Sequence, residues 1–281
     1  VLVAESIGQR DARAEVGRVC LAQVQDQRSN RNLLEMTAMV RSQAPDVPIS
    51  ALAMATLLDR DMLMDIKDAG ADIIGIGMDA ATEELFIKHR GRGARGPHKW
   101  DQHWEIARLA RELYGPYKVN LHIIIGLGET DRELVDMFTD CHSQQIACYL
   151  FSFNPEPGTV LADQPRTPLD RHRRIQLVKH LIETEGLSRE ALRFDAQGGL
   201  TGLDAPGGLV AAAVASGLPF MTDGCPDRHG VMACNRPCGS YRPGEEYRDY
   251  PFQPDENDVL DIQNQMRLHE IWSRQGVPPA E

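Results

Sequence analysis

The cysteines near the C-terminal end are the residues of this 281-residue chain whose types and spacing most directly suggest chemistry. Three of the six, Cys225, Cys234 and Cys238, fall in one Gly- and Pro-rich stretch. A proline follows the first and another precedes the third, which restricts the backbone of the loop. Three thiolates can hold three corners of an iron–sulfur cubane, with His229 or Ser240 as a fourth ligand. The same cysteines with His229 also fit a structural zinc site, and unligated thiols are the third alternative.

Alternating strands and helices must position this loop and any ligand beside it. Short apolar, β-branched runs predict strands, and apolar residues at helical spacing predict helices between them. The expected strands cover residues 18–24, 48–54, 72–77, 118–125 and 147–153. The expected helices cover residues 32–43, 56–68, 82–89, 100–113, 131–144, 167–185, 209–216 and 257–273. This rhythm predicts an α/β fold with parallel strands, as a partial (β/α) barrel of the TIM type or an open doubly wound sheet.

The character of the chain changes near residue 185. Residues 1–185 carry the strand–helix rhythm, whereas residues 186–281 are rich in glycine and proline and include the cysteine loop, which predicts a loop-rich C-terminal extension. The chain opens at Val1 on a pattern typical of a helix already under way, so we expect residues 1–185 to be an N-terminally incomplete core. Thr56 is expected to cap the second helix, and Asn257 or Asp258 the last.

Composition and charge argue against two classes of partner. The formal charge of −11 does not suit nucleic acid, and no stretch approaches the roughly 20 apolar residues of a membrane span. The few, unevenly spaced cysteines and the lack of a secretory leader predict reduced thiols and a cytoplasmic location. We expect Cys20, Cys141 and Cys148 to be buried as small apolar side chains.

Polar and glycine residues stand where the expected strands end, and ligands of parallel α/β folds bind at those ends. Asp79 directly follows an apolar run, where it could accept hydrogen bonds from two ribose hydroxyls or cap the next helix. Gly126 and Gly128 would let the backbone approach a ligand closely. Glu129 follows them, as a ligand contact or as a charge in the first turn of the next helix.

Four stretches of the chain resemble, in order and spacing, the core of biotin synthase and its relatives in the radical S-adenosylmethionine superfamily. They are residues 78–79, 118–119, 125–130 and 157–163, so the resemblance covers about residues 18–163. It implies that Asp79 is the ribose-binding acid and that Gly77 replaces an Asn that usually shares this task. It also implies cofactor contacts from Ile125, Gly126, Gly128, Glu129 and Phe153, with the strands that end near Ile125 and Phe153 beside the adenine.

The family's Cys-x3-Cys-x2-Cys loop, which binds a [4Fe–4S] cluster and S-adenosylmethionine, does not occur in this sequence. The chain is either an N-terminally truncated copy or a degenerate member that has lost the radical chemistry. The pattern at Val1 favours truncation.

The C-terminal stretches 220–226, 234–237 and 242–244 resemble the tails of biotin-synthase-like proteins, including subunits of the archaeal-type two-component lipoyl synthase. The resemblance implies S-adenosylmethionine and [4Fe–4S] clusters as cofactors, and sulfur insertion at an unactivated carbon of an octanoyl chain on a carrier-protein lysine. The expected partners are this carrier-bound acyl substrate, a second radical SAM subunit, and an electron donor such as ferredoxin or flavodoxin. One alternative is a non-catalytic barrel subunit with structural zinc that scaffolds a partner. Another is a different radical SAM transferase or mutase.

Overall fold

The computed structural model describes residues 1–233 and 247–272. The chain forms a parallel sheet in the order β1-β2-β3-β4-β5, so strands that follow one another in sequence are neighbours. Among the described strands, β1 and β5 lie at the two edges, and the sheet is a partial, open barrel rather than a closed one. The predicted fold class, parallel strands alternating with helices, is confirmed. The strands are β1 (Val19–Ala22), β2 (Ile49–Ala53), β3 (Ile73–Asp79), β4 (Val119–Ile125) and β5 (Ala147–Ser152).

Three of the seven residues in each of the strands β3 and β4 are Ile, and most of the side chains of these strands are buried. Continuous apolar runs of this kind are typical of parallel strands that are covered on both faces. The register aligns the starts of neighbouring strands, with Ile49 beside Val19 and Val119 beside Ile74. Their carboxyl ends therefore reach the same edge of the sheet.

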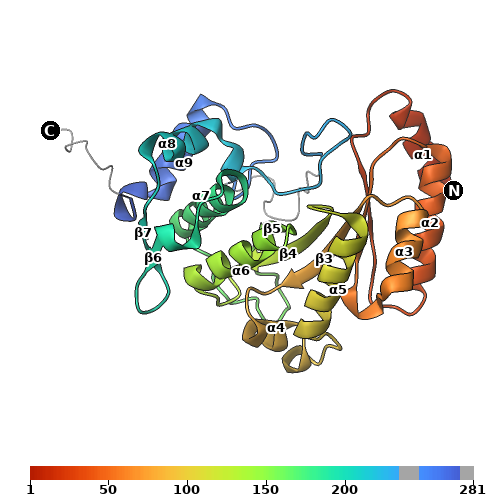
Figure 1. Ribbon diagram of the computed structural model, residues 1–281, viewed down its shortest axis with the longest axis horizontal. Coiled ribbons are helices and arrows are strands. Elements are labelled where there is room, and N and C mark those ends of the chain that lie inside the picture. The colour runs from red at the N-terminus through yellow and green to blue at the C-terminus, as the bar shows by residue number, and fades with distance from the viewer. Residues whose placement is uncertain (234–246, 273–281) are drawn as a thin grey trace. The chain divides into compact units, whose positions relative to one another are not determined.

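The chain divides into two compact units, and the first contains residues 1–123, 143–149 and 223–233. Its helices contact one another in the series α1–α2–α3–α5, which can be followed in Figure 1. Helix α3 starts later than expected, because Asp59 and not Thr56 is its N-cap and residues 55–57 form a separate 3-10 turn. The helices are α1 (Leu2–Asp11), α2 (Ser29–Gln43), α3 (Arg60–Asp68), α4 (Glu83–His89) and α5 (Trp100–Tyr114).

The second unit contains residues 124–142, 150–222 and 247–272. Helix α7 packs against both α8 and α9 (Figure 1). The cap of α9 is Asp255, whose carboxylate accepts from the N–H groups of Asn257 and Asp258 at 2.8 and 2.9 Å, so neither of the two predicted caps is correct. The elements of this unit are α6 (Asp131–Ser143), α7 (Leu169–Glu185), α8 (Gly207–Ser216), α9 (Glu256–Met266) and the antiparallel pair β6 (Leu192–Phe194) and β7 (Leu200–Leu203).

The three cysteines outside the C-terminal loop do not behave alike. Cys141 and Cys148 are buried, as predicted, but Cys20 is exposed. Cys20 lies on β1, an edge strand whose side chains alternate between half-buried and exposed, and this explains the difference. The division of the chain at residue 185 stays a prediction. In the residues that the structure describes, no helix has both the length and the apolar character needed to cross a bilayer.

Candidate functional site

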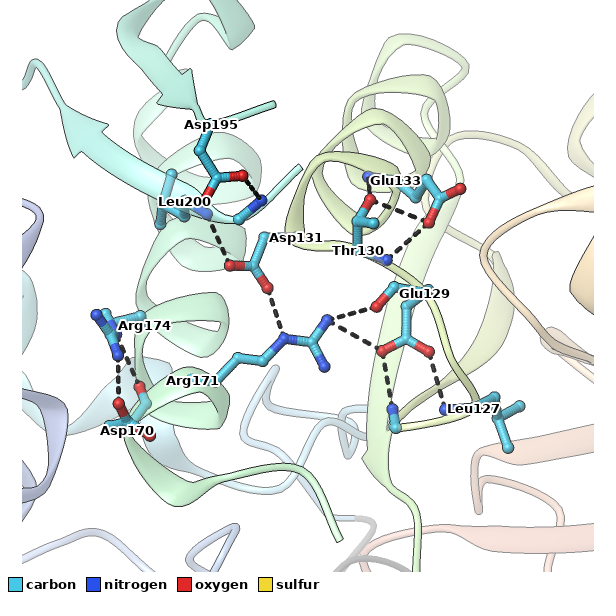
Figure 2. Close-up of polar contacts among 12 residues, drawn as sticks. Leu127, Glu129, Thr130, Asp131, Glu133, Asp170, Arg171, Arg174, Asp195 and Leu200 are labelled. Carbon is cyan, nitrogen blue, oxygen red and sulfur yellow. Dashed lines mark hydrogen bonds and ion pairs between the residues drawn. The ribbon is translucent and has the colours of Figure 1, made fainter. Parts of the chain in front are cut away.

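The loop that leaves β4 is held in shape by one of its own side chains. Gly126 and Gly128 have φ angles of +111° and +118°, a region that side chains other than glycine's enter at a cost. The carboxylate of Glu129 turns back along the loop and accepts hydrogen bonds from the N–H groups of Gly126 and Leu127, at 2.8 and 2.9 Å (Figure 2). Its side chain is only 1% exposed. Glu129 therefore shapes the loop, and its carboxylate faces the protein's own backbone.

Arg171 of α7 connects this loop to neighbouring elements of the second unit. Its guanidinium donates to the backbone oxygen of Glu129 at 2.8 Å, to the carboxylate of Glu129 at 3.2 Å and to the carboxylate of Asp131 at 2.6 Å. Figure 2 shows Arg171 between the two acids. The second oxygen of Asp131 accepts from the N–H of Leu200 at 2.8 Å. One guanidinium thus balances two largely buried carboxylates and ties the loop to α6, α7 and β7.

Helix α6 has its own cap and does not depend on Glu129. Thr130 Oγ1 accepts from the N–H of Glu133 at 3.2 Å, while a carboxylate oxygen of Glu133 accepts from the N–H of Thr130 at 2.7 Å. These reciprocal bonds form a capping box. The first turn of α6 is therefore capped without Glu129, and the place of Glu129 is explained by its hydrogen bonds within the loop.

The backbone of Gly126 lies against residues from the loop that follows β5. A Cβ atom added to Gly126 would lie 2.7 Å from Thr167 Oγ1 and 3.0 Å from Phe153 Cβ. Phe153 also donates its N–H to the backbone oxygen of Ile125 at 2.9 Å. The structure thus brings together Ile125, Gly126 and Phe153 of the predicted site. The Ile125 side chain is fully buried, so only the backbone of this residue is available for contact with a ligand.

Thr167 is a residue near this loop that sequence reasoning missed. It is buried, and its hydroxyl has no hydrogen-bond partner among the described residues. Gln164 was missed as well, and its side-chain amide donates to the backbone oxygen of Gly126. Gln164 lies in a stretch without helical or strand periodicity, and Thr167 was expected to begin the helix of residues 167–185, whereas α7 begins at Leu169. No sequence signal indicated that either residue lies beside Gly126.

Asp79, in the first unit, ends β3 with a φ of +63°, and the pairing of β3 with β4 shifts register between Gly77 and Asp79. The Asp79 side chain is 29% exposed at this end of the strand. Asp79 is not the cap of α4, because that role belongs to Thr82, whose hydroxyl accepts from the N–H of Leu85 at 3.3 Å. The predicted role as a cap is thus wrong, and the role as a ligand contact stays a prediction.

The Asp79 carboxylate accepts a hydrogen bond from the guanidinium of Arg90, which follows α4. Arg90 lies just beyond the helix expected at residues 82–89, and no sequence signal indicated this pair. His98 lies close enough to respond to both charges: burial lowers its pKa below 6.5, the positive charge of Arg90 lowers it further, and the negative charge of Asp79 opposes them. The lowered pKa favours a neutral imidazole near neutral pH.

Cys225 is the one cysteine of the predicted metal loop that the structure describes, since Cys234 and Cys238 lie outside the described residues. It is buried, and Asn120 near the start of β4 approaches its sulfur at 3.7 Å. Next to it, the backbone oxygen of Pro226 accepts from Arg18 at 2.5 Å, and Arg18 also forms two bonds with Asp72 at 2.7 and 2.8 Å. These contacts hold the Cys225 turn near the amino ends of the strands.

Cys225 and Asp79 are thus at different levels of the sheet. Asn120 pairs with Gly75, four positions before Asp79 on β3, which corresponds to roughly 13 Å along the strand. Within the described residues, no three His, Cys, Asp or Glu side chains are arranged to hold a metal ion. His229, the predicted alternative ligand, is exposed in the turn after Cys225. The described part of the chain therefore does not by itself fit an iron–sulfur cluster, and it gives zinc no support.

Comparison with known proteins gives a match over part of the chain. Residues 8–141, slightly less than half of it, match the model of the Radical SAM superfamily. No curated protein is similar enough to this chain to count as a relative. The match concerns the superfamily as a whole and no branch within it.

The fold of this chain is similar to that of a solved structure, and two more structures match it less closely. The crystal structure of methylornithine synthase (PylB) is 15% identical with a TM-score of 0.50, over 64% of this chain and 51% of that one. Coproporphyrinogen III oxidase (HemN) from Escherichia coli is 16% identical with a TM-score of 0.43, over 72% and 46%. The methyltransferase TsrM from Kitasatospora setae is 14% identical with a TM-score of 0.41, over 94% and 46%. This chain therefore spans about half the length of the structures it resembles.

Proposed function

From the match of residues 8–141 to the Radical SAM superfamily model, we propose that this chain binds the adenosyl part of S-adenosylmethionine and belongs to an enzyme that uses it to make a radical. The observation that carries the proposal is the Asp79 carboxylate at the carboxyl end of β3, which is partly open to solvent. A carboxylate in this position can accept hydrogen bonds from the ribose hydroxyls.

Roles in adenine binding are likewise proposed for residues of the second unit. The support is local: Ile125, Gly126 and Phe153 form one backbone surface, and Gly126 leaves no space there for a side chain. Gly128 and Glu129 would act through the shape of this loop, because the Glu129 carboxylate is occupied by backbone N–H groups and Arg171.

Nucleoside binding can be measured without turnover. We expect calorimetric titration with S-adenosylhomocysteine to give saturable binding, and Asp79→Asn to weaken it by about 10- to 100-fold, the usual effect of a hydrogen bond to a charged group. Asp61→Asn, which removes an exposed carboxylate from the first turn of α3, is the matched control and should bind like the unaltered chain. Equal affinity of Asp79→Asn and the unaltered chain would remove Asp79 from the site.

The finer activity follows from the sequence resemblance. We propose sulfur insertion at an unactivated carbon, as in lipoyl synthases, with an octanoyl chain on a carrier protein as substrate. Iron–sulfur clusters would supply the electron and the sulfur for this chemistry, and Cys225, Cys234 and Cys238 would hold one of them. A second radical SAM subunit and a ferredoxin or flavodoxin would be the partners.

Metal analysis tests this finer proposal. After anaerobic reconstitution we expect Cys225→Ala, Cys234→Ala and Cys238→Ala each to lower the content of iron and sulfide. Cys20→Ala, which changes an exposed cysteine, should leave both unchanged. Unchanged iron in all three loop variants would contradict a cluster at this loop. Zinc in place of iron would instead favour a non-catalytic, scaffolding subunit.

A further inference from the structure

Gly77 and Arg90 share a space beside Asp79. A Cβ atom added to Gly77 would lie 3.0 Å from Arg90 Nη1 and 3.6 Å from an oxygen of Asp79. A side chain at position 77 would therefore occupy the place that the guanidinium takes in this chain. The hydrogen-bond donor beside Asp79 comes from Arg90 rather than from position 77 of β3.

Arg90 is held in this place by the helix before it. Helix α4 begins at the Thr82 cap and ends at Arg90, whose N–H donates to the backbone oxygen of Phe86 at 2.8 Å. The Arg90 side chain is 16% exposed, so most of it packs against protein. Phe86 of α4 is fully buried and makes edge-on ring contacts with Trp100 and His103, with 5.6 and 4.8 Å between the ring centroids. These contacts anchor the helix.

We infer that Arg90 is a second recognition residue for the nucleoside and donates a hydrogen bond to a ribose hydroxyl that Asp79 also contacts. This inference rests on the proposed function. A carboxylate can only accept hydrogen bonds, whereas each ribose hydroxyl also has lone pairs that need a donor. One nitrogen of Arg90 bonds one oxygen of Asp79, and a guanidinium has five N–H groups in a planar fork. Arg90 can therefore donate hydrogen bonds to the ribose hydroxyls, while Asp79 accepts hydrogen bonds from them.

The competing possibility is that Arg90 merely neutralises Asp79 and would have to leave before a ligand binds. The two cases predict opposite effects. If Arg90 contacts the ligand, removing its charge weakens binding. If Arg90 blocks Asp79, removing it strengthens binding.

Calorimetric titrations with adenosine, 2′-deoxyadenosine and 3′-deoxyadenosine separate these cases. We expect Arg90→Gln to weaken adenosine binding by about tenfold, and to have little effect on the analogue that lacks the hydroxyl contacted by Arg90. Arg92→Gln makes the same change in charge at an exposed position two residues along and should leave all three affinities unchanged. Circular dichroism checks that each variant is folded.

Gly77→Ala gives an independent test without a change in charge. Its position on β3 has no positive φ, so alanine suits the backbone, and the added methyl group should displace the guanidinium. We expect Gly77→Ala to weaken adenosine binding as Arg90→Gln does, and to cause no further loss when both changes are combined.

The outcomes are distinct. Unchanged or tighter adenosine binding by Arg90→Gln, or an equal loss for all three nucleosides, would overturn the inference and leave the proposed function standing. If the unaltered chain bound neither adenosine nor S-adenosylhomocysteine, the proposed function would fail and this inference with it.

Discussion

Glu129 is a buried acid whose role is to shape the loop after β4. Both carboxylate oxygens accept from backbone N–H groups, and Arg171 supplies the positive charge beside them. A buried carboxylate is stable only when it is paired and hydrogen-bonded in this way. Its neighbours therefore depend on its charge as much as on its size.

Glu129→Gln tests this dependence because it changes one oxygen into an NH₂ group of the same size. The new donor would face a backbone N–H or the Arg171 guanidinium, and Arg171 would lose part of its compensation. We expect the free energy of unfolding to fall by about 2–4 kcal/mol, measured by urea denaturation.

The matched control is Asp136→Asn on α6, which removes the charge of a half-exposed carboxylate that pairs with Arg189. Exposed ion pairs contribute little, so its effect should stay below about 1 kcal/mol. Equal effects of the two variants would show that Glu129 is no more important to the loop than a surface acid.

Helix α7 is an organising element of the second unit because three consecutive residues contact different segments. Arg171 binds Glu129 and Asp131, as described above. His172 lies 3.2 Å from the Asp249 carboxylate, which also accepts from Gln176 at 2.6 Å. Arg173 donates to the side chain of Gln265 on α9 at 3.0 Å, and also to the backbone oxygens of Tyr247 and Arg248. Successive helical side chains point about 100° apart, so three neighbours can hold three segments.

The burial of His172 predicts a loss of stability in acid. Burial lowers the pKa of His172 below its ordinary 6.5, and the charges of Arg173 and Arg248 add to this, while the contact with Asp249 opposes it. The unfolded chain then binds the proton more readily than the folded chain does. The unfolding free energy should fall as the pH drops below about 6.5, by at most about 1.4 kcal/mol per pH unit for this group.

Urea denaturation between pH 5 and 8 measures this slope. His172→Gln keeps a hydrogen-bond donor for Asp249 but cannot bind a proton in this pH range. The slope of its unfolding free energy against pH should therefore be smaller by the contribution of one titrating group. His103 will keep part of the slope in both proteins, because burial lowers its pKa to about 4. His269→Gln, at an exposed position on the same unit, should retain the full slope. A slope in His172→Gln equal to that of the unaltered chain would exclude His172 as the cause.

The elements could be predicted from sequence more fully than the contacts that complete the candidate site. Apolar runs and helical spacing marked the five parallel strands and the helices between them, because burial imposes these patterns directly. Helix starts moved where a better cap lay nearby, as with Asp59 in place of Thr56. Asp79 and Arg90 are 11 positions apart in the sequence, and Glu129 and Arg171 are 42 positions apart. No periodic pattern in the sequence indicates contacts of this kind.

The two compact units are not separate stretches of the chain. The chain passes from one to the other inside β4, between Ile123 and Ile124, and inside β5, between Tyr149 and Leu150. It returns to the first unit at residue 223 with the Cys225 turn, which bonds to Arg18 and Asn120. Both crossings lie inside strands, so each of these strands contributes residues to both units.

This connectivity predicts a single cooperative unfolding transition. Trp100 and Trp104 report on the first unit, and Trp272→Phe removes the remaining tryptophan, so that fluorescence then follows the first unit alone. Circular dichroism follows the helices of both units, including α7, α8 and α9 of the second. Because the units share two strands, we expect the fluorescence and dichroism curves of Trp272→Phe in urea to coincide, as a two-state transition requires. Curves with separate midpoints would mean that the second unit can unfold while the first stays intact, and that the shared strands do not couple them.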